Sequence, residues 1–177
     1  MHWEKIHGWF TFNQLYDNMV KKFDDAIFVE IGTWKGKSAV YMGEKIQAAQ
    51  KNIKFYTIDT FDMTESNDHF GLIDVDDLYD EAAKNINPVN DFVEIIKGNS
   101  HEIYDNFKDE SIDFLFIDGS HQYEDVKKDL ELWFPKMKPN GIISGHDYNH
   151  APIKKAIDDF FNSRAMPYTG GCWYFKK

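Results

Sequence analysis

Five short apolar runs constrain the fold of this chain more than any other feature. They are rich in branched and aromatic residues and lie at Ile27–Ile31, Phe55–Ile58, Phe92–Ile96, Ile112–Ile117 and Ile142–Ile143. A strand with one face in water alternates apolar and polar residues, whereas a strand covered on both faces is apolar nearly throughout. The runs therefore predict the strands of a sheet that is buried on both sides.

Amphipathic stretches that are typical of helices separate these runs. They span residues 10–23, 37–49, 78–86, 123–134 and 153–161. In the fourth, Val126, Leu130 and Trp133 recur at helical spacing, and Pro139-Asn140-Gly141 then predicts a turn before the next strand. Strands that alternate with helices predict an α/β fold, here a Rossmann-like, doubly wound, mostly parallel sheet with helices on both faces.

The C-terminal segment predicts one strand that runs against the others. Gly170-Gly171 suits a turn, and Cys172 to Phe175 suits a strand. No helix separates this strand from the residues before the turn, so we expect it to be antiparallel. A length of 177 residues predicts a single domain over residues 1–177, in which residues 1–26 form an N-terminal helical cap.

Charge and composition exclude several classes of function. The chain has 30 acidic and 20 basic residues, a net charge of −10, and no cluster of Lys and Arg. Nucleic acids and anionic membranes would repel such a surface, so neither is an expected partner. No apolar run approaches the ~20 residues of a membrane helix, the N-terminus lacks a signal-peptide pattern, and the single cysteine suits a reducing compartment. We therefore expect a cytoplasmic protein; its oligomeric state, a homodimer included, stays open.

Acidic residues concentrate in one segment. From Asp59 to Glu81 the sequence has nine acidic residues and no Lys or Arg. A solvated loop that leads into a helix is one interpretation, and a lid beside a binding site is the other.

The first candidate motif is Glu30-Ile31-Gly32-Thr33-Trp34-Lys35-Gly36-Lys37-Ser38. It joins a buried strand to a helix through a turn with two glycines, where free N–H groups can receive a ligand. Any tight strand-to-helix turn also favours glycine. A buried carboxylate such as Glu30 needs a partner, and an ammonium or hydroxyl group of a ligand would supply one.

Two further positions each allow a binding and a structural interpretation. Asp59 ends the second apolar run, where nucleoside-binding folds place an acceptor for ribose hydroxyls; it could instead cap a loop. Asn99 and Ser100 follow the third run, where they could contact a base or cap the next helix.

The fourth motif joins two acids and two histidines. Asp118 and His121 follow one apolar run, and His146 and Asp147 follow the next. In an open parallel sheet, ligands bind beyond the carboxyl ends of the strands, so these four side chains are expected to converge. Oxygen donors with an imidazole suit a divalent ion. Helix capping by Asp118, core packing of His146 and a lysine partner for Asp147 are the structural alternatives.

These motifs together resemble the class I S-adenosylmethionine-dependent methyltransferases, in particular a small branch with a Glu-Ile-Gly-Thr-Trp-x-Gly-x-Ser opening and an Ile-Asp-Gly-x-His-x-Tyr fourth strand. The resemblance implies that the chain binds S-adenosylmethionine, with Trp34 where the middle glycine of the commoner motif stands. It implies that the cofactor is bound by Glu30, Gly32, Thr33, Gly36, Ser38, Asp59, Asn99, Ser100 and Asp118.

The fourth and fifth strands are similar to those of metal-dependent O-methyltransferases that act on catechols and macrolide sugars. The similarity implies Asp118, His146 and Asp147 as ligands of Mg²⁺ or another divalent ion, His121 as the base, and a small-molecule hydroxyl as the acceptor. An oxygen ligand would be expected where His146 stands. A metal-independent methyltransferase and a binding protein without turnover are the alternatives. An NAD-dependent oxidoreductase is disfavoured because the chain lacks a Gly-x-Gly-x-x-Gly turn.

Overall fold

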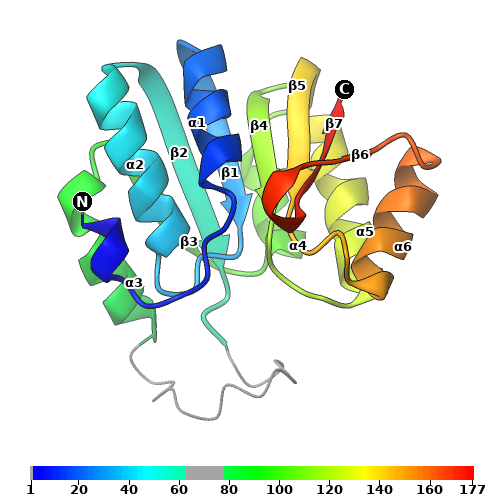
Figure 1. Ribbon diagram of the computed structural model, residues 1–177, viewed down its shortest axis with the longest axis horizontal. Helices are drawn as coiled ribbons and strands as arrows, with labels where there is room; N and C mark the ends of the chain where they lie inside the picture. The colour runs from blue at the N-terminus through cyan, green and yellow to red at the C-terminus, as the bar shows by residue number, and fades with distance from the viewer. Residues whose placement is uncertain (1, 63–77) are drawn as a thin grey trace.

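A seven-stranded sheet forms the centre of the computed structural model, which describes residues 2–62 and 78–177 (Figure 1). The strand order is β3-β2-β1-β4-β5-β7-β6. The strands are β1 (Asp25–Ile31), β2 (Asn52–Asp59), β3 (Val93–Lys97), β4 (Ile112–Ile117), β5 (Met137–Gly145), β6 (Met166–Pro167) and β7 (Trp173–Lys176).

Helices cover both faces of this sheet. They are α1 (Asn13–Lys22), α2 (Lys37–Ala49), α3 (Leu78–Ile86), α4 (Ser100–Ile103), α5 (Tyr123–Trp133) and α6 (Ala151–Phe161), with short 3₁₀ turns at Trp3–Lys5, Asn87–Val89, Tyr104–Asn106, Phe134–Lys136 and Thr169–Gly171. One apolar cluster joins α1 and α2 to the sheet, and a second joins α5 and α6 to it. The predicted α/β sheet with helices on both faces is confirmed.

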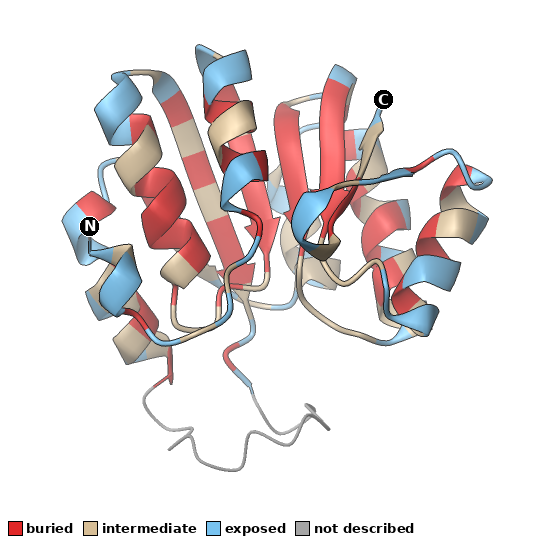
Figure 2. Ribbon diagram, viewed as in Figure 1, coloured by how far each residue is buried: buried red, intermediate tan, exposed pale blue. Residues whose placement is uncertain are grey.

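The direction of the strands also agrees with the prediction. Strands β1 to β5 pair in parallel, and β7 pairs antiparallel with both β5 and β6. Figure 2 shows how the central strands are buried. All six residues of β4 are buried, as a strand covered on both faces requires.

The prediction of a turn at Pro139-Asn140-Gly141 is wrong, because these residues lie within β5. Ile112 pairs with Met137 but Phe114 pairs with Ile142, so β5 holds extra residues opposite β4. They form an irregularity in which Asn140 takes a positive φ of 66°. A proline and a glycine are compatible with a strand at such a bulge.

Most of the acidic segment, residues 63–77, lies outside the described residues. Both interpretations of it, solvated loop and lid, therefore stay predictions. Residues 78–86 form α3 as expected.

Candidate functional site

The site lies at the carboxyl ends of β1, β2, β4 and β5. The chain order reverses beside β1, since β2 lies on one side of it and β4 on the other. Such a switch point leaves a crevice in open α/β sheets and is the usual ligand position. Glu30 lies within β1 and Asp59 is the last residue of β2, and every other sequence-predicted site residue follows the end of one of these strands or of β3.

The glycine turn after β1 lies directly against Asp118. A Cβ atom on Gly32 would lie 2.1 Å from the carbonyl oxygen of Asp118, and Gly32 has a φ of 101°. The backbone N–H of Asp118 donates to the carbonyl of Ile31 at 2.8 Å. Gly36, with a φ of 81°, is the N-cap of α2. The turn therefore needs glycine at position 32 and is fixed to the end of β4.

Glu30 is fully buried within a network of protein hydroxyl groups. Its carboxylate accepts hydrogen bonds from the Tyr16 hydroxyl at 2.7 Å and the Thr57 hydroxyl at 2.8 Å; Ser38 is a further partner, and Thr33 contacts Thr57 at 2.6 Å. Burial raises the pKa of Glu30 to about 7, although these hydrogen bonds act to lower it. The partners of Glu30 are thus groups of the protein itself, and a contact with the cofactor stays a prediction.

Asp59 receives three backbone N–H groups. Its Oδ2 accepts from Thr33 and Trp34, both at 2.8 Å, and its Oδ1 accepts from Phe61 at 2.8 Å. A carboxylate has about four lone-pair directions, so one acceptor direction remains for a ribose hydroxyl. The structure therefore gives Asp59 the loop-capping role and leaves capacity for the binding role.

Asn99 and Ser100 make the contacts that the structural alternative predicts. The Asn99 side chain caps α4 by accepting from the N–H of His101 at 2.9 Å. The Ser100 hydroxyl donates to the buried Asp129 at 2.6 Å. A contact of either residue with adenine stays a prediction.

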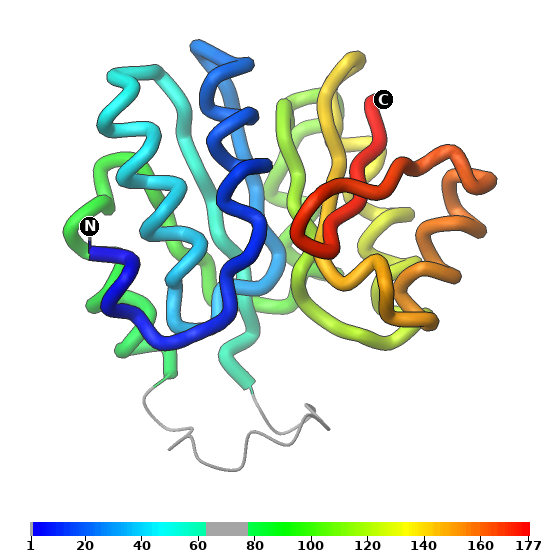
Figure 3. Tube along the Cα trace, viewed as in Figure 1, coloured from blue at the N-terminus to red at the C-terminus, as the bar shows by residue number. Residues whose placement is uncertain are grey.

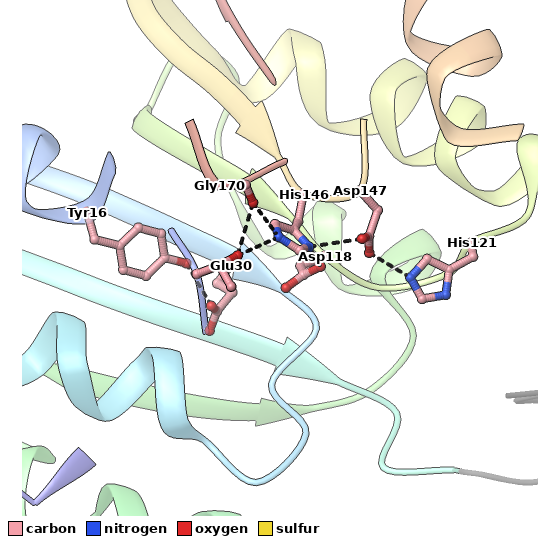
Figure 4. Close-up of polar contacts among 8 residues, drawn as sticks. Tyr16, Glu30, Asp118, His121, His146, Asp147 and Gly170 are labelled. Atoms are coloured by element: carbon pink, nitrogen blue, oxygen red, sulfur yellow. Dashed lines mark hydrogen bonds and ion pairs between the residues drawn. The ribbon is translucent and has the colours of Figure 1, made fainter. Parts of the chain in front are cut away.

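The fourth motif converges as expected. Asp118, His146 and Asp147 bring one ligand atom each to within 4.8 Å of one another. Nδ1 of His146 lies 3.1 Å from Oδ1 of Asp147 and 3.8 Å from Oδ1 of Asp118. Figure 4 shows His146 next to both acids, with Glu30 and then Tyr16 to its left. Burial raises the pKa of Asp118 to about 6, despite the opposing charges of His146 and His121.

His121 joins this group through Asp147. Its Nε2 lies 2.9 Å from Oδ2 of Asp147. The hydrogen bonds from His121 and His146 hold the pKa of Asp147 well below its usual range, so its carboxylate is ionised. Burial alone would lower the pKa of His146, but the hydrogen bond to Asp147 and the charges of both acids raise it.

The donor set fits a divalent cation. Two carboxylates and one imidazole nitrogen converge, and among residues 2–62 and 78–177 no hydrogen bond reaches the Asp118 carboxylate. Carboxylate and imidazole groups are established ligands of divalent metals. These three residues would hold the ion, and His121 would lie in contact with one of its ligands.

Sequence reasoning missed several residues that complete the site. Tyr16 comes from α1 and Thr57 from β2, and Thr11 and Gly170 both contact Nε2 of His146. These are tertiary contacts between distant segments, and no local pattern marks them. Outside this group of missed residues, Trp9, which is 65% exposed, stacks on Trp34 of the glycine turn with ring centroids 5.9 Å apart.

Comparisons with known proteins agree with this architecture. Residues 29–148 match the family described as "Methyltransferase domain". An uncharacterized protein of Sinorhizobium fredii, y4gI, is 30% identical over 119 residues, which is 67% of this chain and 13% of that protein. The chain thus spans much less than two thirds of that relative.

Within the described residues, no helix has the length and apolar character needed to cross a membrane.

Solved structures show the same fold at low sequence identity. The O-methyltransferase NovP superposes with a TM-score of 0.71 at 17% identity, over 93% of this chain and 77% of NovP. An O-methyltransferase from Bacillus cereus in complex with SAH superposes with a TM-score of 0.67 at 20% identity, over 98% of this chain and 84% of that one. The family match covers more than half of the chain. The chain therefore belongs to the methyltransferase-domain family and has the class I S-adenosylmethionine-dependent methyltransferase fold.

Proposed function

We propose that the chain transfers a methyl group from S-adenosylmethionine to a hydroxyl oxygen of a small molecule, with a divalent ion bound by Asp118, His146 and Asp147. The contact between Gly32 and Asp118 carries this proposal. The turn that would hold the methionine part of the cofactor touches the acid that would hold the ion. The methyl donor and the acceptor oxygen would therefore meet at one place.

The cofactor would lie across the carboxyl ends of β1, β2 and β3. Gly32, Thr33 and Gly36 form the turn at the start of α2, with Glu30 and Ser38 in the network beneath it. The remaining acceptor direction of Asp59 suits a ribose hydroxyl. Asn99 and Ser100 follow β3, where they would flank the adenine.

The residues of the chain supply binding, orientation and a base. A bound divalent ion lowers the cost of removing the proton from an acceptor hydroxyl. The ionised carboxylate of Asp147 accepts a hydrogen bond from Nε2–H of His121. In this tautomer Nδ1 of His121 carries the lone pair and is the atom that would take the hydroxyl proton. Because Asp118 lies against the glycine turn, the acceptor oxygen and the methyl group would be held close to one another.

The acceptor we propose is a small molecule rather than a nucleic acid or a lipid surface. A net charge of −10 disfavours both polyanionic partners. A cytoplasmic location, a single domain over residues 1–177 and a homodimer as one candidate assembly remain parts of this proposal. So does the N-terminal helical cap predicted over 1–26, although its last two residues begin β1.

Calorimetric titration with S-adenosylmethionine and S-adenosylhomocysteine tests the first half of the proposal. We expect saturable binding of both at one site. Incubation of labelled S-adenosylmethionine with a panel of small hydroxyl compounds, with and without divalent ions, tests the second half by formation of S-adenosylhomocysteine. His121→Ala should lower turnover by about 10²–10⁴-fold without changing cofactor affinity, and His2→Ala, at an exposed position, is the matched control.

Two results would count against the proposal in different ways. Folded protein that gives neither heat nor a thermal shift with either compound does not bind the cofactor. Protein that binds the cofactor but forms no product with any acceptor, with or without metal, behaves as a binding protein. Unchanged turnover in His121→Ala excludes His121 as the base.

A further inference from the structure

The imidazole of His146 contacts two residues besides Asp118 and Asp147, namely Thr11 before α1 and Gly170 before β7. Its Nε2 is 2.8 Å from the carbonyl oxygen of Gly170 and 2.9 Å from Oγ1 of Thr11, and Thr11 Oγ1 itself donates to the Gly170 carbonyl at 3.0 Å. A carbonyl oxygen only accepts, so Nε2 of His146 carries a hydrogen. Figure 3 shows where the segment before α1 meets the turn before β7.

This tautomer directs an electron pair into the site. With hydrogen on Nε2, the neutral ring presents the lone pair of Nδ1, which lies 3.1 Å from Asp147 Oδ1 and 3.8 Å from Asp118 Oδ1 (Figure 4). A lone pair and two carboxylates at such distances repel one another unless a positive charge lies among them. Either a metal ion or a proton on Nδ1 can supply that charge.

We infer that Asp118, His146 and Asp147 form a site for a divalent transition metal such as Co²⁺ or Zn²⁺ in preference to Mg²⁺, and that Thr11 and the Gly170 carbonyl orient its nitrogen ligand. This inference rests on the proposed function and deepens it. Mg²⁺ favours six oxygen ligands in a near-ideal octahedron, whereas imidazole suits later transition metals. A nitrogen at position 146 therefore changes the class of ion that the site selects.

Thr11 is a positioning residue in this arrangement. A metal-ligating histidine commonly donates its second N–H to a carbonyl or carboxylate, which fixes the ring and raises the basicity of the ligand. Here the Gly170 carbonyl and the Thr11 hydroxyl share that role, because both contact Nε2 of His146 and the hydroxyl also donates to the carbonyl. Removal of such an outer partner typically costs about 10–100-fold in metal affinity.

Metal titration of protein stripped with a chelator tests the inference without any methyl acceptor. Calorimetry with Co²⁺, Zn²⁺ and Mg²⁺ gives three affinities, and the visible absorption of Co²⁺ reports nitrogen ligation. We expect one Co²⁺ or Zn²⁺ per chain, bound at least about tenfold more tightly than Mg²⁺, on the ordering of metal preferences for nitrogen ligands. His146→Asn restores an oxygen donor and should reduce this preference by about tenfold or more.

Matched variants separate the site from surface binding and from misfolding. His2→Asn removes an exposed histidine and should leave the Co²⁺ affinity and spectrum unchanged. Thr11→Val keeps the shape of the side chain but removes the hydroxyl, and should weaken Co²⁺ binding by about 10–100-fold. Thr11→Ser keeps the hydroxyl and should restore most of that affinity.

The outcomes distinguish failure of this inference from failure of the proposed function. Mg²⁺ that binds as tightly as Co²⁺, or a Co²⁺ spectrum that His146→Asn does not change, overturns the preference for a transition metal. Binding of no metal by protein that still binds S-adenosylmethionine overturns the inference in favour of a proton on Nδ1, and the methyltransferase function stands. Failure to bind S-adenosylmethionine contradicts the proposed function whichever metal is bound.

Discussion

The backbone N–H of Trp34 donates a 2.8 Å hydrogen bond to Oδ2 of Asp59, which ties the turn after β1 to the acid that ends β2. Trp34 has a φ of 46°, in the left-handed region that costs a non-glycine residue roughly 1–2 kcal/mol. The same oxygen also accepts from Thr33. Asp59 therefore stabilises the backbone conformation of the turn that carries the Trp34 indole ring.

Replacement of Asp59 by alanine should reduce both stability and cofactor affinity. The variant loses the acceptor of three backbone N–H groups, and hydrogen bonds to charged groups contribute about 1.5–3 kcal/mol each. We expect the free energy of unfolding to fall by about 2–4 kcal/mol, measured by urea denaturation, and S-adenosylmethionine affinity to fall as well. Asp25→Ala, at the opposite end of β1, is the control. Full cofactor affinity in Asp59→Ala would exclude Asp59 from the cofactor site.

Gly32→Ala should be among the most destabilising single substitutions in the site. The added Cβ would lie 2.1 Å from the backbone oxygen of Asp118, and the φ of 101° is unfavourable for any other residue. We expect a loss of more than about 3 kcal/mol in thermal or urea unfolding. Gly119→Ala is the matched control, because its Cβ would meet a side-chain methyl of Ile31 at 3.3 Å. Equal stability of the two variants would contradict the close approach at Gly32.

Glu30 should make stability fall as pH rises toward neutrality. Burial raises its pKa from 4.5 to about 7, so between these pH values the folded protein holds a proton that the unfolded chain releases. The free energy of unfolding then decreases across this window and levels off above it. A shift of this size corresponds to roughly 3 kcal/mol.

Glu30→Gln isolates that contribution, because the amide does not titrate. Relative to the wild type, the variant should gain stability between about pH 5 and pH 7, in urea unfolding at a series of pH values. Asp118, with its pKa raised to about 6, also makes the free energy of unfolding fall as pH rises. This contribution is present in both proteins and cancels when their free energies of unfolding are subtracted. A constant difference between the two proteins across this range would show that Glu30 keeps an ordinary pKa.

Two substitutions of Asn99 separate its capping role from a role in cofactor binding. Asn99→Ala removes the acceptor for the N–H of His101 and should cost about 1 kcal/mol in unfolding free energy. Asn99→Asp keeps a capping oxygen and should keep the stability, but it loses the amide donor. If Asn99→Asp keeps the stability of the wild type but binds S-adenosylmethionine more weakly, a contact between Asn99 and adenine is supported. If both variants bind S-adenosylmethionine as the wild type does, Asn99 acts as a cap only.

The sequence predicts the layers and the strand directions because those properties follow from local patterns. The continuous apolar runs identify strands covered on both faces, and β4 confirms this at all six positions. The prediction of a turn at Pro139-Asn140-Gly141 was wrong because the same residues also suit a bulge within a strand. Only the pairing of β5 with β4 decides between a turn and a bulge. Propensity alone does not contain that information.

The candidate site is predictable to the extent that strand ends share one edge of the sheet. Asp118, His146 and Asp147 converge for that reason. The partners of Glu30 and His146 were not predictable, because Tyr16 and Thr11 lie on a segment that precedes β1 and Gly170 lies in the turn between β6 and β7. Their proximity depends on tertiary packing, which no motif in the sequence encodes.

The contact between Thr11 and Gly170 has a consequence for biosynthesis. The two residues are separated by 159 positions. The hydrogen bond from the Thr11 hydroxyl can therefore form only after Gly170 has been synthesised. Strands β1 to β5 can pair once Gly145 has emerged from the ribosome, but the carbonyl that orients His146 follows about 25 residues later, roughly 1–5 s at ordinary translation rates. A nascent chain in this interval can pair strands β1 to β5 before the Gly170 carbonyl has been made, so the orientation of the His146 imidazole is completed only in polypeptides that already contain residue 170.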